Sequence, residues 1–300
     1  MALILAALML MSLCPAGAED GDVWYLRLIS APRDAEYVDF GKVKVSDFEA
    51  FYAFLSQLPN VKKVDMFANA LRVTQCEEIA DRFPDIEFGW TIVIKDNTHT
   101  HTIRTDMTAY STLHINGYNP HGNVLARAFR FCRHLKALDF GHNTVDTLDF
   151  LYELPELRVL IIACNQISDI TPIASLKHLE YLEIFNNDIT DISPLAGLTT
   201  LIDLNMGYNR VEDYTPLLGL KNLKRLWLYR SNSKKVDKPV PKDVVAMLKE
   251  ALPDTHIDTV SEPSLGGWRD ENHPHRQIVF RMMRTNVYEP FPDSWPEIEE

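Results

Sequence analysis

Aromatic and charged side chains gather between residues 181 and 230 of this 300-residue chain, and their types suit binding better than bond breaking. Several recur at one interval: Arg225 follows Asp203 by 22 residues, and Arg230 follows Tyr208 by 22. Large aromatic rings next to arginine are enriched where protein interfaces gain most of their binding energy. The candidate ligand-binding residues are Tyr181, Glu183, Phe185, Asp203, Tyr208, Arg225, Trp227, Tyr229 and Arg230. The alternative interpretation is that these rings pack on one another, or under residues 95–127 or the C-terminal tail.

Sequence motifs of catalysis are missing, so we predict no catalytic residue, no metal and no cofactor. The chain has no G-x-S-x-G, no H-E-x-x-H and no phosphate-binding glycine loop. Two histidine pairs, His99 with His101 and His273 with His275, supply only two imidazoles each, and no third ligand is fixed by spacing. We interpret them as exposed loop histidines. A hydrolase with its site in the loop and tail around His99, His101 and His273 is the alternative from a different functional class.

The elements that position the candidate residues are repeats of 22 residues that follow the template L-x-x-L-x-L-x-x-N-x-[IV]. The repeats begin at Leu135, Leu157, Leu179 and Leu201, with a partial fifth at Leu223. A strict period of this length predicts a solenoid in which stacked turns share one core. Within a turn, Leu182 and Ile184 alternate with Tyr181, Glu183 and Phe185, which predicts a strand with the aliphatic residues pointing inward.

Asparagines at the ninth template position predict a ladder of amides that satisfies backbone groups at the corner after each strand. The ladder residues are Asn69, Asn143, Asn165, Asn187 and Asn209. Hydroxyl–proline pairs such as Thr171-Pro172 and Ser193-Pro194 then predict the N-cap and first residue of short helical turns on the other side.

With these motifs, residues 135–232 resemble the internalin-type leucine-rich repeats of bacterial secreted proteins. The resemblance implies an α/β fold, a right-handed leucine-rich repeat solenoid shaped as a horseshoe or arc. Its concave face would carry a parallel β-sheet, and its convex face short helical or 3₁₀ segments. The resemblance also implies recognition of proteins.

The domain organisation follows from where the template holds. We expect a signal peptide at 1–18, with cleavage after Ala18, because an apolar run leads to an A-x-A pattern. Lipidation at Cys14 ranks below simple cleavage, since Leu13 is a poor lipobox residue. We expect irregular, more helical repeats at 19–94, an inserted loop or hairpin and lead-in at 95–134, regular repeats at 135–232, and a C-terminal helix, strand and aromatic capping tail at 233–300.

Charge and cysteine content narrow the partners and the compartment. The net charge of −12 disfavours nucleic acid and anionic membranes. Acidic residues fill the fifth template position of four turns: Asp39, Asp65, Asp139 and Glu183. This column favours a basic partner. The equally weighted alternative is that these are ordinary solvated side chains of the outward face. Three cysteines lie outside the predicted signal peptide: Cys76, Cys132 and Cys164. Because an odd number leaves at least one thiol unpaired, they argue against a disulfide framework. No transmembrane segment is predicted.

The sequence therefore predicts an exported, non-enzymatic binding protein that is secreted or associated with the cell surface. It would recognise a protein or peptide on the concave face of its repeats. Recognition of cell-wall glycan by the same face is the alternative within this class, since aromatic rings beside carboxylates also suit sugars.

Overall fold

The computed structural model describes residues 21–95, 100–112, 122–230, 239–261 and 266–292. The predicted signal peptide, Cys14 and His99 lie outside these ranges. The chain divides into two compact units, one formed by residues 1–93 and 102–104 and the other by 94–101 and 105–300. None of the helices within the described ranges is long and apolar enough to cross a bilayer.

The first unit alternates strands with helices. It begins with the antiparallel pair β1 (Val23–Tyr25) and β2 (Ile29–Ala31), followed by β3 (Tyr37–Asp39), α2 (Phe48–Leu55), β4 (Lys63–Leu71), α3 (Val73–Arg82), β5 (Glu87–Lys95) and β6 (Thr100–Arg104). Strands β3, β4 and β5 are parallel neighbours, because each helix carries the chain back to the start of the next strand. Asn69 accepts a hydrogen bond from the amide of Val45 and donates to the carbonyls of Val43 and Met66.

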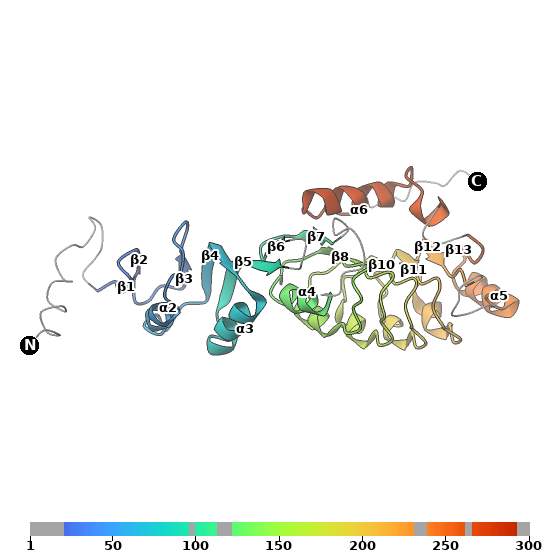
Figure 1. Cartoon of the computed structure of the whole chain (residues 1–300). Coiled ribbons are helices and arrows are strands. Elements are labelled where there is room, and N and C mark those ends of the chain that lie inside the picture. Colours follow the sequence, from blue (N-terminus) through green and yellow to red (C-terminus); the bar gives the residue numbers. More distant parts are fainter. Residues whose placement is uncertain (1–20, 96–99, 113–121, 231–238, 262–265, 293–300) are drawn as a thin grey trace, which may run out of the picture. The chain divides into compact units, whose positions relative to one another are not determined.

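The second unit is the solenoid. Among its described residues, seven parallel strands form one sheet in the order β13-β12-β11-β10-β9-β8-β7 (Figure 1). The strands are β7 (Ala109–Ser111), β8 (Ala137–Asp139), β9 (Val159–Ile161), β10 (Tyr181–Glu183), β11 (Asp203–Asn205), β12 (Arg225–Trp227) and β13 (His256–Asp258). Equivalent template positions pair in register, so Leu160, Leu182 and Leu204 lie side by side. All three are fully buried and form the leucine core with the inward residues of the other turns.

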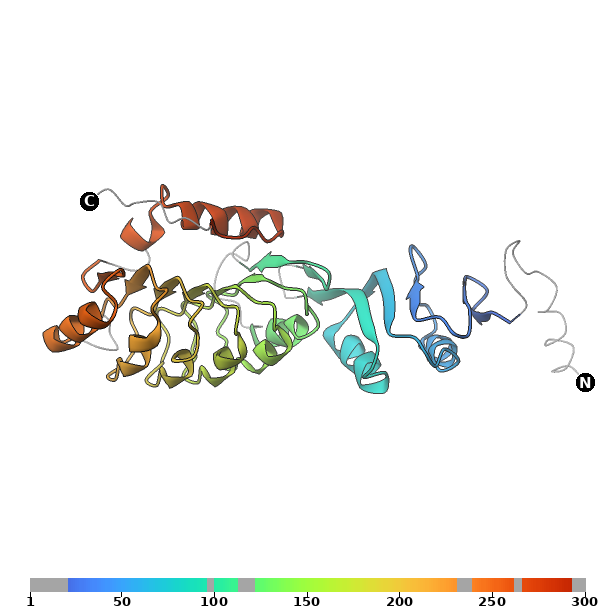
Figure 2. The same ribbon diagram turned by 180° about the vertical axis from the view of Figure 1, so that it is seen from behind.

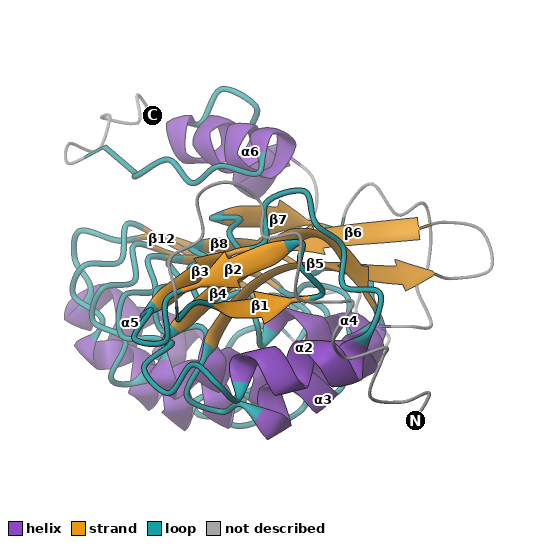
Figure 3. Ribbon diagram, turned by 90° about the vertical axis from the view of Figure 1, so that its left-hand side faces the viewer, coloured by secondary structure: helices purple, strands orange, loops and turns teal. Residues whose placement is uncertain are grey.

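Short helical segments cover the core on the side away from the sheet. They are α4 (Gly122–Phe129), η1 (Asp149–Glu153), η2 (Thr171–Ser175), η3 (Ser193–Leu195), η4 (Thr215–Gly219) and α5 (Lys242–Ala251). Figure 3 shows α4 and α5 on that side, and the long helix α6 (Pro274–Thr285) on the opposite side of the strands. Four of the segments are 3₁₀ helices, since a 22-residue turn leaves little chain for a full α-helix.

The corners of the solenoid are held by the asparagine side chains. Asn187 donates to the carbonyls of Ile184 in its own turn and Ile162 in the preceding turn, both at 3.0 Å, and accepts from the amide of Ile167. Asn165 and Asn209 make the equivalent bonds one turn away. Because each amide bridges two turns, the ladder fixes the register of the stack.

The start of each 3₁₀ segment differs from the prediction. Thr171 and Ser193 do not cap with their hydroxyls; the segments begin at these residues, and proline follows. The cap comes from an aspartate two residues earlier: Asp169 Oδ1 accepts from the amide of Thr171 at 2.8 Å, and Asp191 Oδ1 accepts from the amide of Ser193 at 2.8 Å. In the pattern D-x-[ST]-P, the aspartate side chain thus supplies an acceptor for the backbone amide at the exposed start of each segment.

Residues 95–134 were predicted to form an inserted loop or hairpin and the lead-in to the regular repeats. They contain β6, β7 and α4, and β7 pairs in register with β8, with Tyr110 opposite Leu138. β6 is a neighbour of β5 in the four-stranded sheet, whereas β7 and α4 belong to one more turn of the solenoid. The spacing from Ala109 of β7 to Ala137 of β8 is six residues longer than the 22 of the other turns. Cys132 is buried in the same turn, where burial raises the pKa of its thiol to about 12, as expected for an inert core cysteine.

Candidate functional site

The outward face of the seven-stranded sheet points away from the leucine core and carries most of the predicted ligand-binding residues. It was predicted to be an open surface, and this prediction is wrong for its central part. The buried members of the predicted set are Tyr181, Glu183, Phe185, Asp203, Arg225 and Trp227. Tyr181, Asp203 and Arg225 share one row of the sheet, because they are register partners on β10, β11 and β12.

The chain's own C-terminal segment covers this face. The docked tail consists of residues 266–291: the 3₁₀ segment η5 (Gly266–Arg269), helix α6 and the stretch that ends at Phe291. Figures 1 and 2 show α6 lying along the sheet over β7 and β8, and α6 contacts both strands. The sequence predicted that the tail caps the last turn of the coil. Instead, it runs back over the outward face.

Trp268 is the aromatic anchor of the docked tail. Its side chain is fully buried, with its ring centroid 5.4 Å from that of Tyr181 and 5.6 Å from that of Trp227. The Arg225 guanidinium lies 4.3 Å from the same ring. Gly267 permits this approach, since a Cβ there would lie 2.7 Å from Trp227 Cζ2. The aromatic side chains predicted to bind a ligand thus bind the tail.

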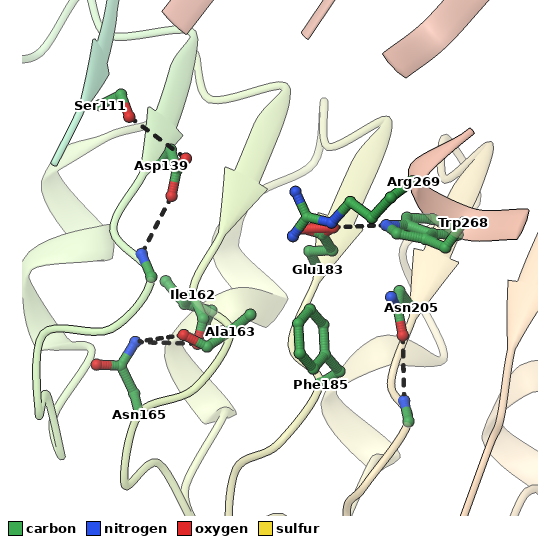
Figure 4. A network of polar contacts seen from close by, with 12 residues as sticks. Ser111, Asp139, Ile162, Ala163, Asn165, Glu183, Phe185, Asn205, Trp268 and Arg269 are labelled. Atoms are coloured by element: carbon green, nitrogen blue, oxygen red, sulfur yellow. Dashed lines mark hydrogen bonds and ion pairs between the residues drawn. The ribbon is translucent and has the colours of Figure 1, made fainter. Parts of the chain in front are cut away.

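Two buried carboxylates receive charged partners at the same interface. Glu183 accepts hydrogen bonds from Trp268 Nε1 and, at 2.8 Å, from Arg269 Nη2, so both partners belong to the tail (Figure 4). Asp203 accepts two hydrogen bonds from the neighbouring Arg225, and His275 Nδ1 of α6 lies 3.1 Å from Asp203 Oδ2. Burial raises the pKa of Asp203, but attraction to Arg225 and these hydrogen bonds outweigh it and hold the pKa below its usual value.

Asp139 is the third buried carboxyl of the outward face, and its surroundings differ. It accepts from the Gly141 amide at 3.1 Å and from Ser111 Oγ at 3.3 Å (Figure 4). Burial, together with the charge of Glu183, raises the pKa of Asp139 to about 6 against the lowering effect of these hydrogen bonds and of Arg269. No basic side chain forms an ion pair with Asp139 among the described residues.

The acidic column therefore has a structural explanation at each position. Asp39 and Asp139 fold back onto the backbone amide two residues ahead, in the same way as Asn205 does with Gly207. Asp65 accepts from the Tyr37 hydroxyl at 2.9 Å, and Glu183 pairs with Arg269. Side chains of this type stabilise the turn after a strand whether or not they carry charge. The role in attracting a basic partner stays a prediction.

Three predicted residues remain partly accessible, and we call them the rim: Tyr208, Tyr229 and Arg230. The ring centroids of the two tyrosines lie 5.3 Å apart at 75°, an edge-to-face arrangement. Arg230 Nη1 lies 3.4 Å from the Tyr214 hydroxyl. Tyr208 has a φ of 55°, and His142, Cys164 and Asn186 share this left-handed conformation at the same template position. The corner of each turn therefore presents the eighth side chain outward.

The histidines of the described part of the chain do not gather with other metal-ligating side chains into a metal-binding group. No group of three or more His, Cys, Asp or Glu side chains there is arranged to hold a metal ion. The prediction that His273 and His275 are exposed is wrong: His273 caps α6 through Nδ1, and His275 stacks on Phe291 at 4.4 Å. Burial and the charge of Arg225 lower the pKa of His273 to about 4, so it is neutral at physiological pH.

Sequence reasoning missed the tail residues Trp268, Arg269 and His275 as partners of the outward face. One signal could have found them. Ile278, Val279, Met282 and Met283 recur at helical spacing and predict an amphipathic helix that needs an apolar surface. The same chain offers an apolar surface at Ala109, Ala137, Val159 and Ile161.

Comparisons with known proteins agree with this geometry. A family model described as Leucine Rich repeats (2 copies) matches residues 155–197 and 177–218, and one described as Leucine Rich repeat matches residues 131–147. A search of curated proteins finds no match.

Solved structures of low sequence identity also match the chain. The chain is similar to internalin C2 from Listeria monocytogenes, at 21% identity over 77% of this chain and 79% of that chain, with a TM-score of 0.37. An internalin, inlF, of the same species is 23% identical over 75% of this chain and 54% of that chain, with a TM-score of 0.39. The third is the ectodomain of the Arabidopsis thaliana receptor kinase GASSHO1/SCHENGEN3, solved in complex with Casparian strip integrity factor 2. It is 16% identical over 65% of this chain and 20% of that chain, with a TM-score of 0.32. The matched repeats, the parallel sheet and the 3₁₀ segments make the solenoid of this chain a leucine-rich repeat fold.

Proposed function

We propose that this chain is a secreted, non-enzymatic binding protein of bacterial origin that recognises a protein or peptide partner at the rim of its repeat sheet. Leucine-rich repeat proteins commonly bind protein partners and generally act as scaffolds without catalysis. The observation that carries the proposal is the accessibility of the rim. Tyr208, Tyr229 and Arg230 stay half-buried at the strand ends, whereas the aromatic residues beside them are fixed under the docked tail.

The chemistry of the rim favours a polypeptide. Two tyrosine rings offer apolar surface with a hydroxyl each, and a guanidinium offers several donors for carbonyl or carboxylate oxygens. Arg230 is half-buried, and its guanidinium lies against the Tyr214 hydroxyl through Nη1. Cell-wall glycan is the second candidate for the same rim, because sugar rings also stack on tyrosine.

The test uses peptides selected against the full chain from a displayed random library, with affinity measured by titration. Tyr229→Ala and Arg230→Ala should each weaken the selected peptides by about tenfold or more, the scale of a modest hot-spot residue. Tyr152→Ala is the matched control, since Tyr152 is an exposed tyrosine on η1, on the far side of the core. Binding that survives both rim substitutions, or sedimentation with purified peptidoglycan but with no peptide, would contradict the proposal.

A further inference from the structure

The outward face beneath the docked tail has the shape of a helix-binding surface. Helix α6 buries Ile278, Val279, Met282 and Met283 on one side and exposes Phe280 and the arginines of its other side. The buried residues join one cluster with Ala109, Ala137, Val159 and Ile161 of strands β7, β8 and β9. Alanines at two neighbouring strands let the helix approach closely, and the methionines fill the space that remains.

Charge adds selectivity to this surface. The charged contact comes from Arg269 of η5, whereas Arg281 of α6 pairs with Glu289 of the tail itself. Glu183 takes both of its hydrogen-bonded partners, Trp268 and Arg269, from the tail. A buried carboxylate needs such partners, so the surface accepts only a segment that brings a cation and a donor to Glu183.

The position of the tail in the chain allows it to leave. It follows β13, the last strand of the sheet, and it packs on the face opposite the leucine core. Its departure therefore exposes the outward face but not Leu160, Leu182 or Leu204. Docking also has a cost, because the Tyr181 hydroxyl and the Trp227 indole N–H are buried without a hydrogen-bond partner among the described residues. Water can reach both groups when the tail is undocked.

We propose that residues 266–291 are an intramolecular ligand, and that the outward face beneath them accepts an amphipathic helix of a partner protein in exchange. The partner helix has two adjacent pairs of apolar residues, four positions apart, as Ile278/Val279 and Met282/Met283 are in α6. An arginine and an aromatic N–H donor precede the helix and reach Glu183, as Arg269 and Trp268 do in the tail. This inference rests on the proposed binding function and extends it from the rim to the covered part of the same face.

Hydrogen exchange of the unmodified full chain is the first test. The proposal predicts that the amides of α6 exchange through local openings that leave the amides of β10 and β11 protected. Exchange of α6 only together with these strands, in one global unfolding event, would overturn it.

Peptide exchange is the second test, with a labelled synthetic peptide of residues 266–291 as the probe. Gly267→Ala in the full chain weakens the docked tail through the close contact with Trp227, so the peptide should bind this variant at least about tenfold more tightly than the wild type. Gly197→Ala is the matched control, because a Cβ there meets nothing within 4 Å and affinity should not change. A second peptide with Val279→Asp and Met282→Asp should not bind.

Failure of the peptide to bind the Gly267→Ala variant would overturn the proposal. If this variant does not fold, hydrogen exchange of the wild type shows whether α6 opens independently of β10 and β11, and so tests the proposal by itself. A dimer of the variant in light scattering would assign the face to the tail of a second copy and would overturn the assignment to a partner protein. Peptides selected at the rim test a separate surface, so their binding would uphold the proposed function even if the tail never opens.

Discussion

Asp139 shows how one buried side chain makes the solenoid sensitive to pH. Its pKa is about 6 in the folded chain because burial disfavours the carboxylate, and the value in an unfolded chain is close to 3.8. The folded state therefore binds more protons between these two values. The contribution of Asp139 to the free energy of unfolding is therefore fully present below about pH 4, and it is lost as the pH rises through about 6.

Replacing Asp139 by asparagine should remove this loss. The amide oxygen can still accept from the Gly141 amide, as Asn205 does from Gly207 at the equivalent position. We expect Asp139→Asn to raise the free energy of unfolding by about 2–3 kcal/mol at pH 7, with little change at pH 4. Urea denaturation at several pH values measures this difference. Asn205→Asp is the reciprocal control and should destabilise at pH 7; a destabilised Asp139→Asn at neutral pH would show that the carboxylate itself is required.

At the scale of the structural element, the stacking of turns depends on the asparagine ladder more than on the strands, which are only three residues long. Asn187→Ala would leave the amide of Ile167 and the carbonyls of Ile162 and Ile184 without these bonds in the buried corner. We expect the free energy of unfolding to fall by about 3 kcal/mol or more. Asn186→Ala, one residue away at a half-buried position, should cost about 1 kcal/mol. Equal losses for the two variants in urea denaturation would contradict the ladder's role.

The elements that follow the 22-residue template could be predicted from the sequence, because each one repeats its neighbour in register. Strand β7 could not, since its turn carries Tyr110 and Thr112 where other turns have leucine, isoleucine, methionine or phenylalanine. The hydroxyl–proline pairs predict caps at Thr171 and Ser193, whereas the acceptors are the aspartates two residues before them, which the pairs do not indicate. The template thus predicts a turn only where its core positions are apolar.

At the scale of the whole chain, the site depends on contacts that no local pattern encodes. Trp268 and Glu183 are 85 residues apart, and His275 and Asp203 are 72 residues apart. The sequence predicts which residues lie on the outward face. It allows two interpretations of them, binding of a ligand or packing under the tail. Only the contacts between the tail and the outward face decide between these two interpretations. The central part of the face that the sequence predicted to bind a ligand is covered by the C-terminal segment of the same chain.

The most direct test of this account is the position of α6 in solution. In a sample with labelled methionine and alanine methyl groups, nuclear Overhauser contacts should connect Met282 or Met283 of α6 with Ala109 or Ala137 of β7 and β8, which share its apolar cluster. These contacts should persist on dilution, as required for docking within one chain. Their absence, with the methionine methyl groups exposed to solvent, would contradict the claim that the tail is the occupant of the outward face.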